Sequence, residues 1–175
     1  MGKEIGLGGL IDRLSEVHGV ERIRYTTSHP NDMNKDLIRA HGQQEKLMPS
    51  LHLPVQSGSN KILQSMNRRH SVENYINVIS ELRNSRSDMA LSSDFIVGFP
   101  GETDEDFEQT IDLIKEVKFS QAYSFKYSVR PGTPAGVMVE QVPEELKDER
   151  LFVLQDVLKK QQTEFNSSKV GNVLQ

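Results

Sequence analysis

One stretch, Leu91 to Thr103, constrains the fold more than any other part of the chain. Ser92 to Val97 starts polar and ends in an unbroken apolar run, a pattern typical of a parallel strand covered on both faces. The tight turn Gly98-Phe-Pro-Gly101 stops this run. Thr103 and Asp106 then form a capping-box-like pair, and apolar residues recur behind them at helical spacing. The stretch therefore predicts a strand, a glycine-rich turn and the start of a helix.

A corner of this kind lies at the carboxyl end of a strand, which is where α/β proteins bind ligands. Gly98 and Gly101 would let a ligand approach bare backbone. Taken alone, however, a Gly-x-x-Gly turn is better explained as a well-formed connection without a ligand. The neighbouring segments decide between these two interpretations.

Three more segments follow the order of strand, polar turn and helix. The predicted strands cover residues 20–27, 51–55, 92–97 and 120–127. Pro54 makes a central paired position less favourable for the second strand. The βαβα order implies a parallel sheet with right-handed crossovers. Four such units are half of a (β/α)8 barrel, so the predicted fold is α/β, a partial (β/α) barrel of about four parallel strands with outer helices.

Composition limits both the class of protein and its chemistry. The 175 residues fit one domain, and 35% hydrophobic with 26% charged residues indicates a soluble globular chain. No apolar run has the length of a membrane span and no secretory signal follows Met1, which favours the cytoplasm. The formal charge of −4 gives no overall attraction to nucleic acid, although a local basic patch can exist. Cysteine is absent, which excludes disulfides, thiolate nucleophiles and cysteine-bound clusters.

Polar groups follow all four predicted strands, and in a barrel they would converge at one mouth. They are Thr26, Thr27, Ser28 and His29, then Gln56 and Ser57, then the Gly98–Glu102 turn, and finally Ser128 and Arg130. Amides and hydroxyls suit ribose and a guanidinium suits a carboxylate, so this set could hold a polar cofactor that carries both groups. Asp94, which is polar within an apolar strand, either faces the mouth or pairs with a basic side chain.

Each of these residues has a simpler explanation when it is considered alone. His29, before a proline, is more often a capping residue than a base, and Ser57 is more often a helix cap. Asn67 to His70 is expected to be an exposed basic loop in which Arg68 and Arg69 are solvated. The prediction of a site therefore rests on the joint occurrence of polar groups at successive strand ends.

Four motifs together resemble the radical S-adenosylmethionine methylthiotransferases. They are Arg22-Ile-Arg-Tyr-Thr-Thr-Ser-His-Pro30, Leu51-His-Leu-Pro-Val-Gln-Ser-Gly-Ser59, Ser92-Ser-Asp-Phe-Ile-Val-Gly-Phe-Pro-Gly-Glu-Thr103 and Arg130-Pro-Gly-Thr-Pro-Ala135. The second and third resemble the wider family, whereas the first and last lean towards its tRNA-modifying branch of the MiaB type. That branch makes 2-methylthio-N(6)-dimethylallyladenosine beside the anticodon. The resemblance covers nearly the whole chain, from about Leu7 onward.

The resemblance also shows what this sequence lacks. The family binds one iron–sulfur cluster through three cysteines of an amino-terminal domain. It binds a second, which cleaves S-adenosylmethionine, through CxxxCxxC on the first barrel loop. Neither cysteine set is present here. Because the family ends in a small RNA-binding TRAM domain, we expect residues 1–168 to be the carboxyl half of the radical barrel. Residues 169–175 would begin a truncated TRAM domain, so the chain would be a fragment or a split-gene product.

By this resemblance, Gln56 and Ser57 lie where the ribose of S-adenosylmethionine is held, Ile96 to Gly98 line its adenine, and Arg130 lies at the mouth of the last strand. The implied cofactors are S-adenosylmethionine and [4Fe–4S] clusters, and the implied partner is a tRNA. No metal ligand and no catalytic residue is assigned within this chain.

Three functional interpretations follow from the resemblance. The favoured one is a part of the catalytic domain that is inactive alone. The second is a half-barrel subunit that completes a separate cysteine-bearing chain. The third is a non-catalytic RNA-binding or scaffold module, against which the charge of −4 and the aromatic content of 6% argue.

Overall fold

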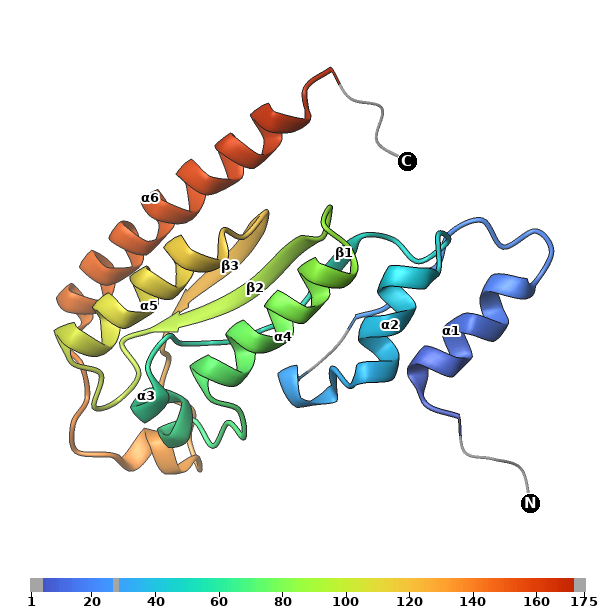
Figure 1. Ribbon diagram of the computed structural model, residues 1–175. Coiled ribbons are helices and arrows are strands. Elements are labelled where there is room, and N and C mark those ends of the chain that lie inside the picture. The colour runs from blue at the N-terminus through green and yellow to red at the C-terminus, as the bar shows by residue number, and fades with distance from the viewer. Residues whose placement is uncertain (1–4, 27–28, 172–175) are drawn as a thin grey trace.

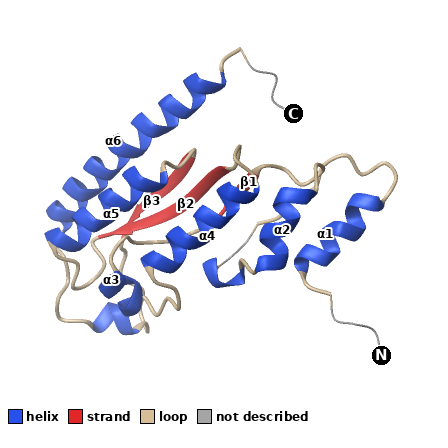
Figure 2. Cartoon of the chain, viewed as in Figure 1, coloured by secondary structure: helices blue, strands red, loops and turns tan. Residues whose placement is uncertain are grey.

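The computed structural model describes residues 5–26 and 29–171, and it shows a small parallel sheet with helices packed on one side (Figures 1 and 2). In chain order the elements are α1 (Leu7–Glu16), η1 (Pro30–Asp32), α2 (Lys35–Gln43), β1 (Ser50–His52), α3 (Asn60–Ser65), α4 (Val72–Ser85), β2 (Ala90–Val97), α5 (Asp104–Val117), β3 (Gln121–Lys126), η2 (Pro134–Val137) and α6 (Glu144–Lys169). The three strands are ordered β1-β2-β3, and both pairings are parallel. Within the described residues, no helix has the length and apolarity that a membrane crossing requires.

The sheet has three strands where the sequence predicts four, because residues 20–26 contribute a single bridge. Ile23 pairs with Leu47 in the parallel direction, and its N–H donates to the Lys46 carbonyl at 2.7 Å. Beyond this bridge the chain leaves the sheet, and the Tyr25 hydroxyl lies 2.7 Å from Nε2 of His41 on α2. This side-chain contact replaces the backbone pairing that the alternation of Ile23 and Tyr25 predicted. Thr27 lies outside the described residues.

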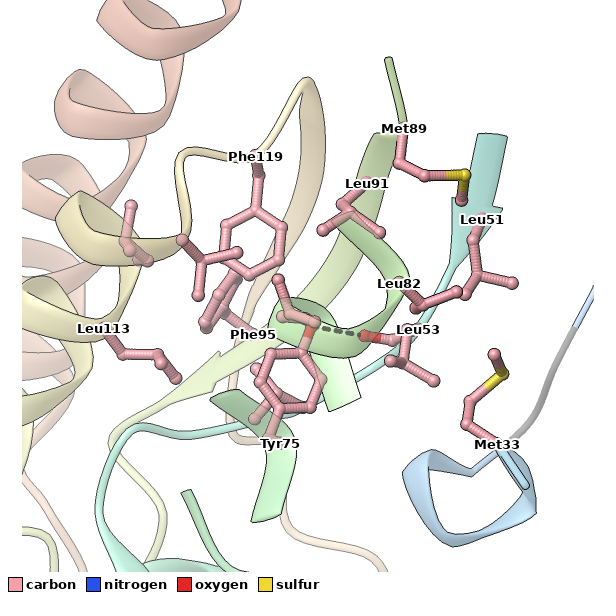
Figure 3. Close-up of a cluster of buried hydrophobic side chains, with 14 of the residues drawn as sticks. Met33, Leu51, Leu53, Tyr75, Leu82, Met89, Leu91, Phe95, Leu113 and Phe119 are labelled. Atoms are coloured by element: carbon pink, nitrogen blue, oxygen red, sulfur yellow. Dashed lines mark hydrogen bonds between the residues drawn. The ribbon is translucent and has the colours of Figure 1, made fainter. Parts of the chain in front are cut away.

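β2 is covered on one face only, which corrects the expectation of two covered faces. The buried residues alternate with partly exposed ones, and they are Leu91, Ser93, Phe95 and Val97. The buried face packs against α4, α5 and α6 in the core drawn in Figure 3. There the Tyr75 hydroxyl from α4 donates to the Leu53 carbonyl at 2.8 Å. The opposite face of β2 carries Asp94 and Ile96, which are left available to line a site.

Pro54 shortens β1, as its missing N–H predicted. The strand ends at His52, but the chain continues beside β2 as far as Gln56, whose N–H donates to the Asp94 carbonyl at 2.9 Å. Between His52 and Gln56, the Val55 N–H donates to the Ser93 hydroxyl at 3.0 Å. A side chain of β2 thus satisfies the backbone next to the proline, and Gln56 is delivered to the end of the sheet.

Two histidines, His41 and His70, are buried, with 1% and 4% of their surface exposed. His70 corrects the expectation that the whole loop from Asn67 is exposed, because its ring packs edge-on against His29 with the ring centroids 5.0 Å apart. Burial, followed by repulsion from Arg86, lowers the pKa of His41 to about 4. Burial, followed by repulsion from His29, likewise lowers the pKa of His70 to about 4. Both rings are therefore neutral in the folded chain at pH 7.

The folded chain should lose stability as the pH falls from about 6.5 to about 4. Above this window the two histidines are neutral in both states, whereas within it only the unfolded chain takes up their protons. Each histidine should contribute a loss of roughly 3 kcal/mol by pH 4. Urea unfolding at a series of pH values measures the effect. Replacing both histidines by glutamine should flatten the curve, and an unchanged slope in this double variant would contradict the assignment.

Candidate functional site

The carboxyl ends of the strands point towards α3 and η2, and two polar corners meet there (Figure 1). One is the Gln56–Ser59 corner that follows β1, and the other is the Gly98–Thr103 corner that follows β2. The predicted capping pair opens α5, since the Asp106 N–H donates to Thr103 Oγ1 at 3.2 Å and Asp106 Oδ2 accepts the Thr103 N–H at 2.9 Å. This capping box confirms the prediction of a strand, a turn and a helix for the stretch.

Asp106 also joins the two corners to each other. Its Oδ1 accepts the Ser59 hydroxyl at 2.6 Å, and its Oδ2 accepts the Lys61 ammonium at 2.8 Å. Burial opposes the charged carboxylate, but hydrogen bonds from Lys61, Ser59 and Thr103 hold the pKa of Asp106 below its usual range. The ionised carboxylate therefore clamps the start of α3 to the start of α5.

Ser57 and Gly58 pack directly onto α5. The Gly58 N–H donates to Thr110 Oγ1 at 2.9 Å, and a Cβ at Gly58 would lie 2.4 Å from the carbonyl of Gln109. Ser57 is buried, and its hydroxyl lies 3.3 Å from Thr110 Oγ1 and accepts the Ser59 N–H at 3.1 Å. Ser57, the predicted ribose contact, thus lies on the side of the corner that packs against α5. The residue that caps α3 is Ser59.

Gly98 is held by α6 through a buried ion pair. It adopts a left-handed conformation with φ +70°, and its N–H donates to Glu102 Oε1 at 2.8 Å. The same oxygen accepts Nη1 of Arg150 at 2.8 Å, and both side chains of this pair are less than 5% exposed. Burial raises the pKa of Glu102, while the Gly98 N–H and the Arg150 guanidinium act against that shift. Gly98 therefore lies on the side of the turn that packs against α6, next to Lys147.

A cavity of about 780 Å³ lies in front of these corners, on the face of the sheet that the helices leave uncovered. Three of the five predicted residues line it: Gln56, Ile96 and Arg130. Gln56 has φ +78°, which is uncommon for a residue other than glycine, and such strain is concentrated at functional sites. The ends of β1, β2 and β3 therefore meet at one mouth, which is three of the four strand ends that the sequence predicted to converge.

Aromatic residues of the cavity were missed by the sequence reasoning. Phe99 and Tyr127 pack edge to face with their centroids 5.1 Å apart, and Phe125 adds a third ring. Within the described residues, the buried Tyr127 hydroxyl has no hydrogen-bond partner. The alternation of Tyr123, Phe125 and Tyr127 along β3 was the available signal.

Asp94 satisfies both predicted alternatives. It lines the cavity, and its Oδ2 lies 3.5 Å from Nε2 of His52 on β1. The other ring nitrogen of His52 lies 3.0 Å from the Ser92 hydroxyl. His52 and Ser92 thus form a polar row beside Asp94 and do not themselves line the cavity.

The outer wall of the cavity is the segment from Arg130 to Ala135, which leads into η2. Thr133 Oγ1 donates to the Arg130 carbonyl at 2.8 Å and accepts the Gly136 N–H at 3.3 Å. Gln141 donates to the Ala135 carbonyl at 3.0 Å. Among the described residues, all hydrogen bonds of this wall are local in sequence.

Of the polar groups predicted after the first strand, the described residues Thr26 and His29 do not line the cavity. His29 caps η1, because its Nδ1 accepts the Asn31 N–H at 3.1 Å, as its position before a proline suggested. Thr27 and Ser28 lie outside the described residues. No group of three histidine, aspartate or glutamate side chains in residues 5–26 and 29–171 is arranged to hold a metal ion.

Comparison with known proteins places this chain in a family. Residues 5–114 match the family described as the Radical SAM superfamily. The tRNA-2-methylthio-N(6)-dimethylallyladenosine synthase of Ehrlichia ruminantium is 62% identical over 170 residues, which are 97% of this chain and 38% of that enzyme. The enzyme of the same name from Rickettsia rickettsii is 58% identical over 98% of this chain and 39% of its own length. The chain thus spans about two fifths of these relatives.

A solved structure supports the architecture. Coproporphyrinogen III oxidase from Escherichia coli, described as a radical SAM enzyme, superposes with a TM-score of 0.62 at 18% identity. The match covers 76% of this chain and 31% of that one. At this identity the likeness shows the fold alone, an α/β arrangement that corresponds to part of a barrel.

Proposed function

The chain belongs to the Radical SAM superfamily, and on that premise we propose that it forms the S-adenosylmethionine-binding wall of a tRNA methylthiotransferase. The proposed product is 2-methylthio-N(6)-dimethylallyladenosine, as the names of the relatives suggest. The observation that carries the proposal is the meeting of Gln56, Ile96 and Arg130 around one cavity. A tRNA substrate would place the reaction in the cytoplasm.

The residues present fit S-adenosylmethionine. When bound, this cofactor supplies the methyl and adenosyl groups of the family's chemistry. The Gln56 amide suits the ribose hydroxyls, Ile96 offers an apolar surface to adenine, and Arg130 suits the carboxylate. Ser57 and Gly98 complete the proposed set by holding the two corners in position from behind.

The residues present do not fit an iron–sulfur cluster. Such clusters are held by cysteine thiolates, and the sequence contains none. The proposed role of this chain is therefore to bind and orient S-adenosylmethionine and the RNA. A cysteine-bearing polypeptide would carry the clusters as its partner. The favoured interpretation remains a catalytic-domain part that is inactive alone.

The proposed domain division follows the same resemblance. Residues 1–168 would form the carboxyl half of the radical barrel, and 169–175 would begin a TRAM domain. The helix α6 ends at Lys169, so the proposed boundary coincides with the end of the last described element. Residues 172–175 lie outside the described residues.

Replacing Arg130 or Gln56 by alanine should weaken S-adenosylmethionine binding by about tenfold or more, because each change removes a polar contact to a charged or ribose group. Isothermal titration of the purified 175-residue chain measures this. Methylthioadenosine, which lacks the carboxylate, is the matched ligand, and Arg130→Ala should leave its affinity unchanged. Gln64→Ala on the exposed side of α3 is the control variant. An equal affinity of all variants for S-adenosylmethionine would overturn the proposed site.

A further inference from the structure

A second hollow lies beside the cavity and is polar where the cavity is largely apolar. It encloses about 520 Å³, and six of its lining residues are His29, Asn31, Asp32, Asn67, Arg68 and Arg69. Met66, Asn67 and Arg68 line both spaces, so the two hollows share one ridge at the end of α3. We propose that this hollow binds a backbone phosphate of the RNA strand whose reacting base is presented at the mouth of the cavity, next to S-adenosylmethionine. This inference rests on the proposed function and adds a phosphate subsite to it.

The two arginines carry the charge that such a site needs. Among the described residues, no carboxylate lies within ion-pair distance of Arg68 or Arg69, whereas Arg39, Arg86 and Arg150 are all paired. The hollow is lined by one carboxylate, that of Asp32, and by the two guanidinium groups of Arg68 and Arg69. The planar guanidinium donates two parallel hydrogen bonds to a phosphate, which makes arginine the usual residue for this contact. The hollow is thus a positive site on a chain whose formal charge is −4.

The backbone that carries the arginines is fixed in advance. The Arg68 N–H donates to the Leu63 carbonyl at 2.9 Å, and the Asn31 side chain donates to the Arg69 carbonyl at 3.1 Å. Asn67 turns the chain immediately before the two arginines with φ +57°. His70 anchors the far end of the loop by its burial. A loop held at both ends loses little entropy when a ligand binds, so its charges are available for affinity.

The shared ridge of Met66, Asn67 and Arg68 connects the polar hollow to the cavity. Arg68 is partly exposed and faces both hollows, whereas Arg69 is exposed and lines only the polar one. An RNA strand that presents its reacting base at the mouth of the cavity would leave its charged phosphates in solvent beside that mouth. The basic hollow adjoins the mouth, which favours an RNA strand over an acidic protein segment.

The test is RNA affinity and its dependence on salt. Fluorescence anisotropy would follow binding of a labelled RNA hairpin with a single-stranded loop to the 175-residue chain and to the variant R68A/R69A. Affinity at low salt should fall by at least about tenfold. The slope of log affinity against log salt should decrease in magnitude by about 0.7 for each phosphate that the variant no longer neutralises. R68K/R69K keeps both charges, so it should retain the slope while its affinity falls only in part.

K159A/K160A is the charge-matched control, because both lysines are exposed on α6, which does not line the hollow. An equal loss of affinity in this control, or an unchanged salt slope in R68A/R69A, would overturn the proposal. Selective loss of binding to a polyglutamate peptide, with RNA affinity intact, would assign the hollow to an acidic protein instead and also overturn it. Competition by inorganic phosphate that is as strong as competition by unlabelled RNA would show a free-anion site and reject the RNA assignment.

The two proposals can fail separately. If S-adenosylmethionine binds as expected but R68A/R69A binds RNA normally, the phosphate subsite fails and the proposed function stands. If S-adenosylmethionine does not bind but R68A/R69A loses RNA affinity, the subsite stands and the cofactor assignment fails.

Discussion

Replacing Glu102 by alanine is expected to destabilise the folded chain by about 3 to 5 kcal/mol. The change leaves the Arg150 guanidinium, which is 4% exposed, without its buried partner. It also removes the acceptor of the Gly98 N–H, which donates to Glu102 Oε1 at 2.8 Å. A buried charge without its partner and an unsatisfied backbone donor are both costly, and the two penalties arise at one point.

Asp104→Ala is the matched control for this prediction. Asp104 accepts from the same guanidinium at 2.7 Å, but its side chain is 86% exposed. Its removal should cost less than about 1 kcal/mol, as is usual for exposed pairs. Urea unfolding of both variants gives the comparison. Equal losses at the buried and the exposed carboxylate would show that burial does not decide the strength of this contact.

Gly58→Ala is expected to cost about 2 to 3 kcal/mol and to disturb the cavity. The added Cβ would lie 2.4 Å from the Gln109 carbonyl and 2.5 Å from the Cα of Thr110, both of which are backbone atoms of α5. The helix must therefore move away from the corner, and that movement stretches the hydrogen bond from Ser59 to Asp106. Because Gln56 lies next to this corner, S-adenosylmethionine affinity should fall together with stability.

Gly132→Ala is the control that distinguishes the cost of steric crowding at Gly58 from the cost of an unfavourable backbone conformation. Gly132 has φ +80°, and apart from its two chain neighbours no atom of the described residues lies within 4 Å of the place that a Cβ would take. Alanine there should therefore cost only about 1 kcal/mol, through its backbone conformation. Thermal unfolding and titration with S-adenosylmethionine compare the two variants. A smaller effect at Gly58 than at Gly132 would mean that α5 yields easily, contrary to the rigid contact described above.

Local patterns predicted the features that depend on local chemistry. The capping box at Thr103, the interruption at Pro54 and the approach of Gln56 and Arg130 to one cavity follow from neighbouring residues and from the parallel order of the strands, whereas Ile96 was assigned through the family resemblance. The direction of a side chain behind a turn depends instead on the helix that packs against it. For that reason Ser57 lies on α5 and Gly98 lies against α6, outside the lining of the cavity.

Long-range pairings were beyond the reach of the sequence. Glu102 and Arg150 are 48 positions apart, and nothing in either neighbourhood identifies the other as its partner. His70 looked like part of a solvated loop because three polar residues precede it, yet the ring is buried beside His29. The pairing of residues 20–26 was overestimated because alternation describes which side chains are buried, and α2 covers Tyr25 without any strand pairing.

Because the described hydrogen bonds of residues 130–136 are all local in sequence, one wall of the cavity mouth is easier to move than the other. Moving this segment breaks no described hydrogen bond to β2 or α5, whereas the opposite wall is fixed by Asp106 and Thr110. The two walls are therefore expected to have different roles in ligand binding. The stiff wall sets which ligand fits, and the compliant one is expected to govern how fast a ligand is admitted and released.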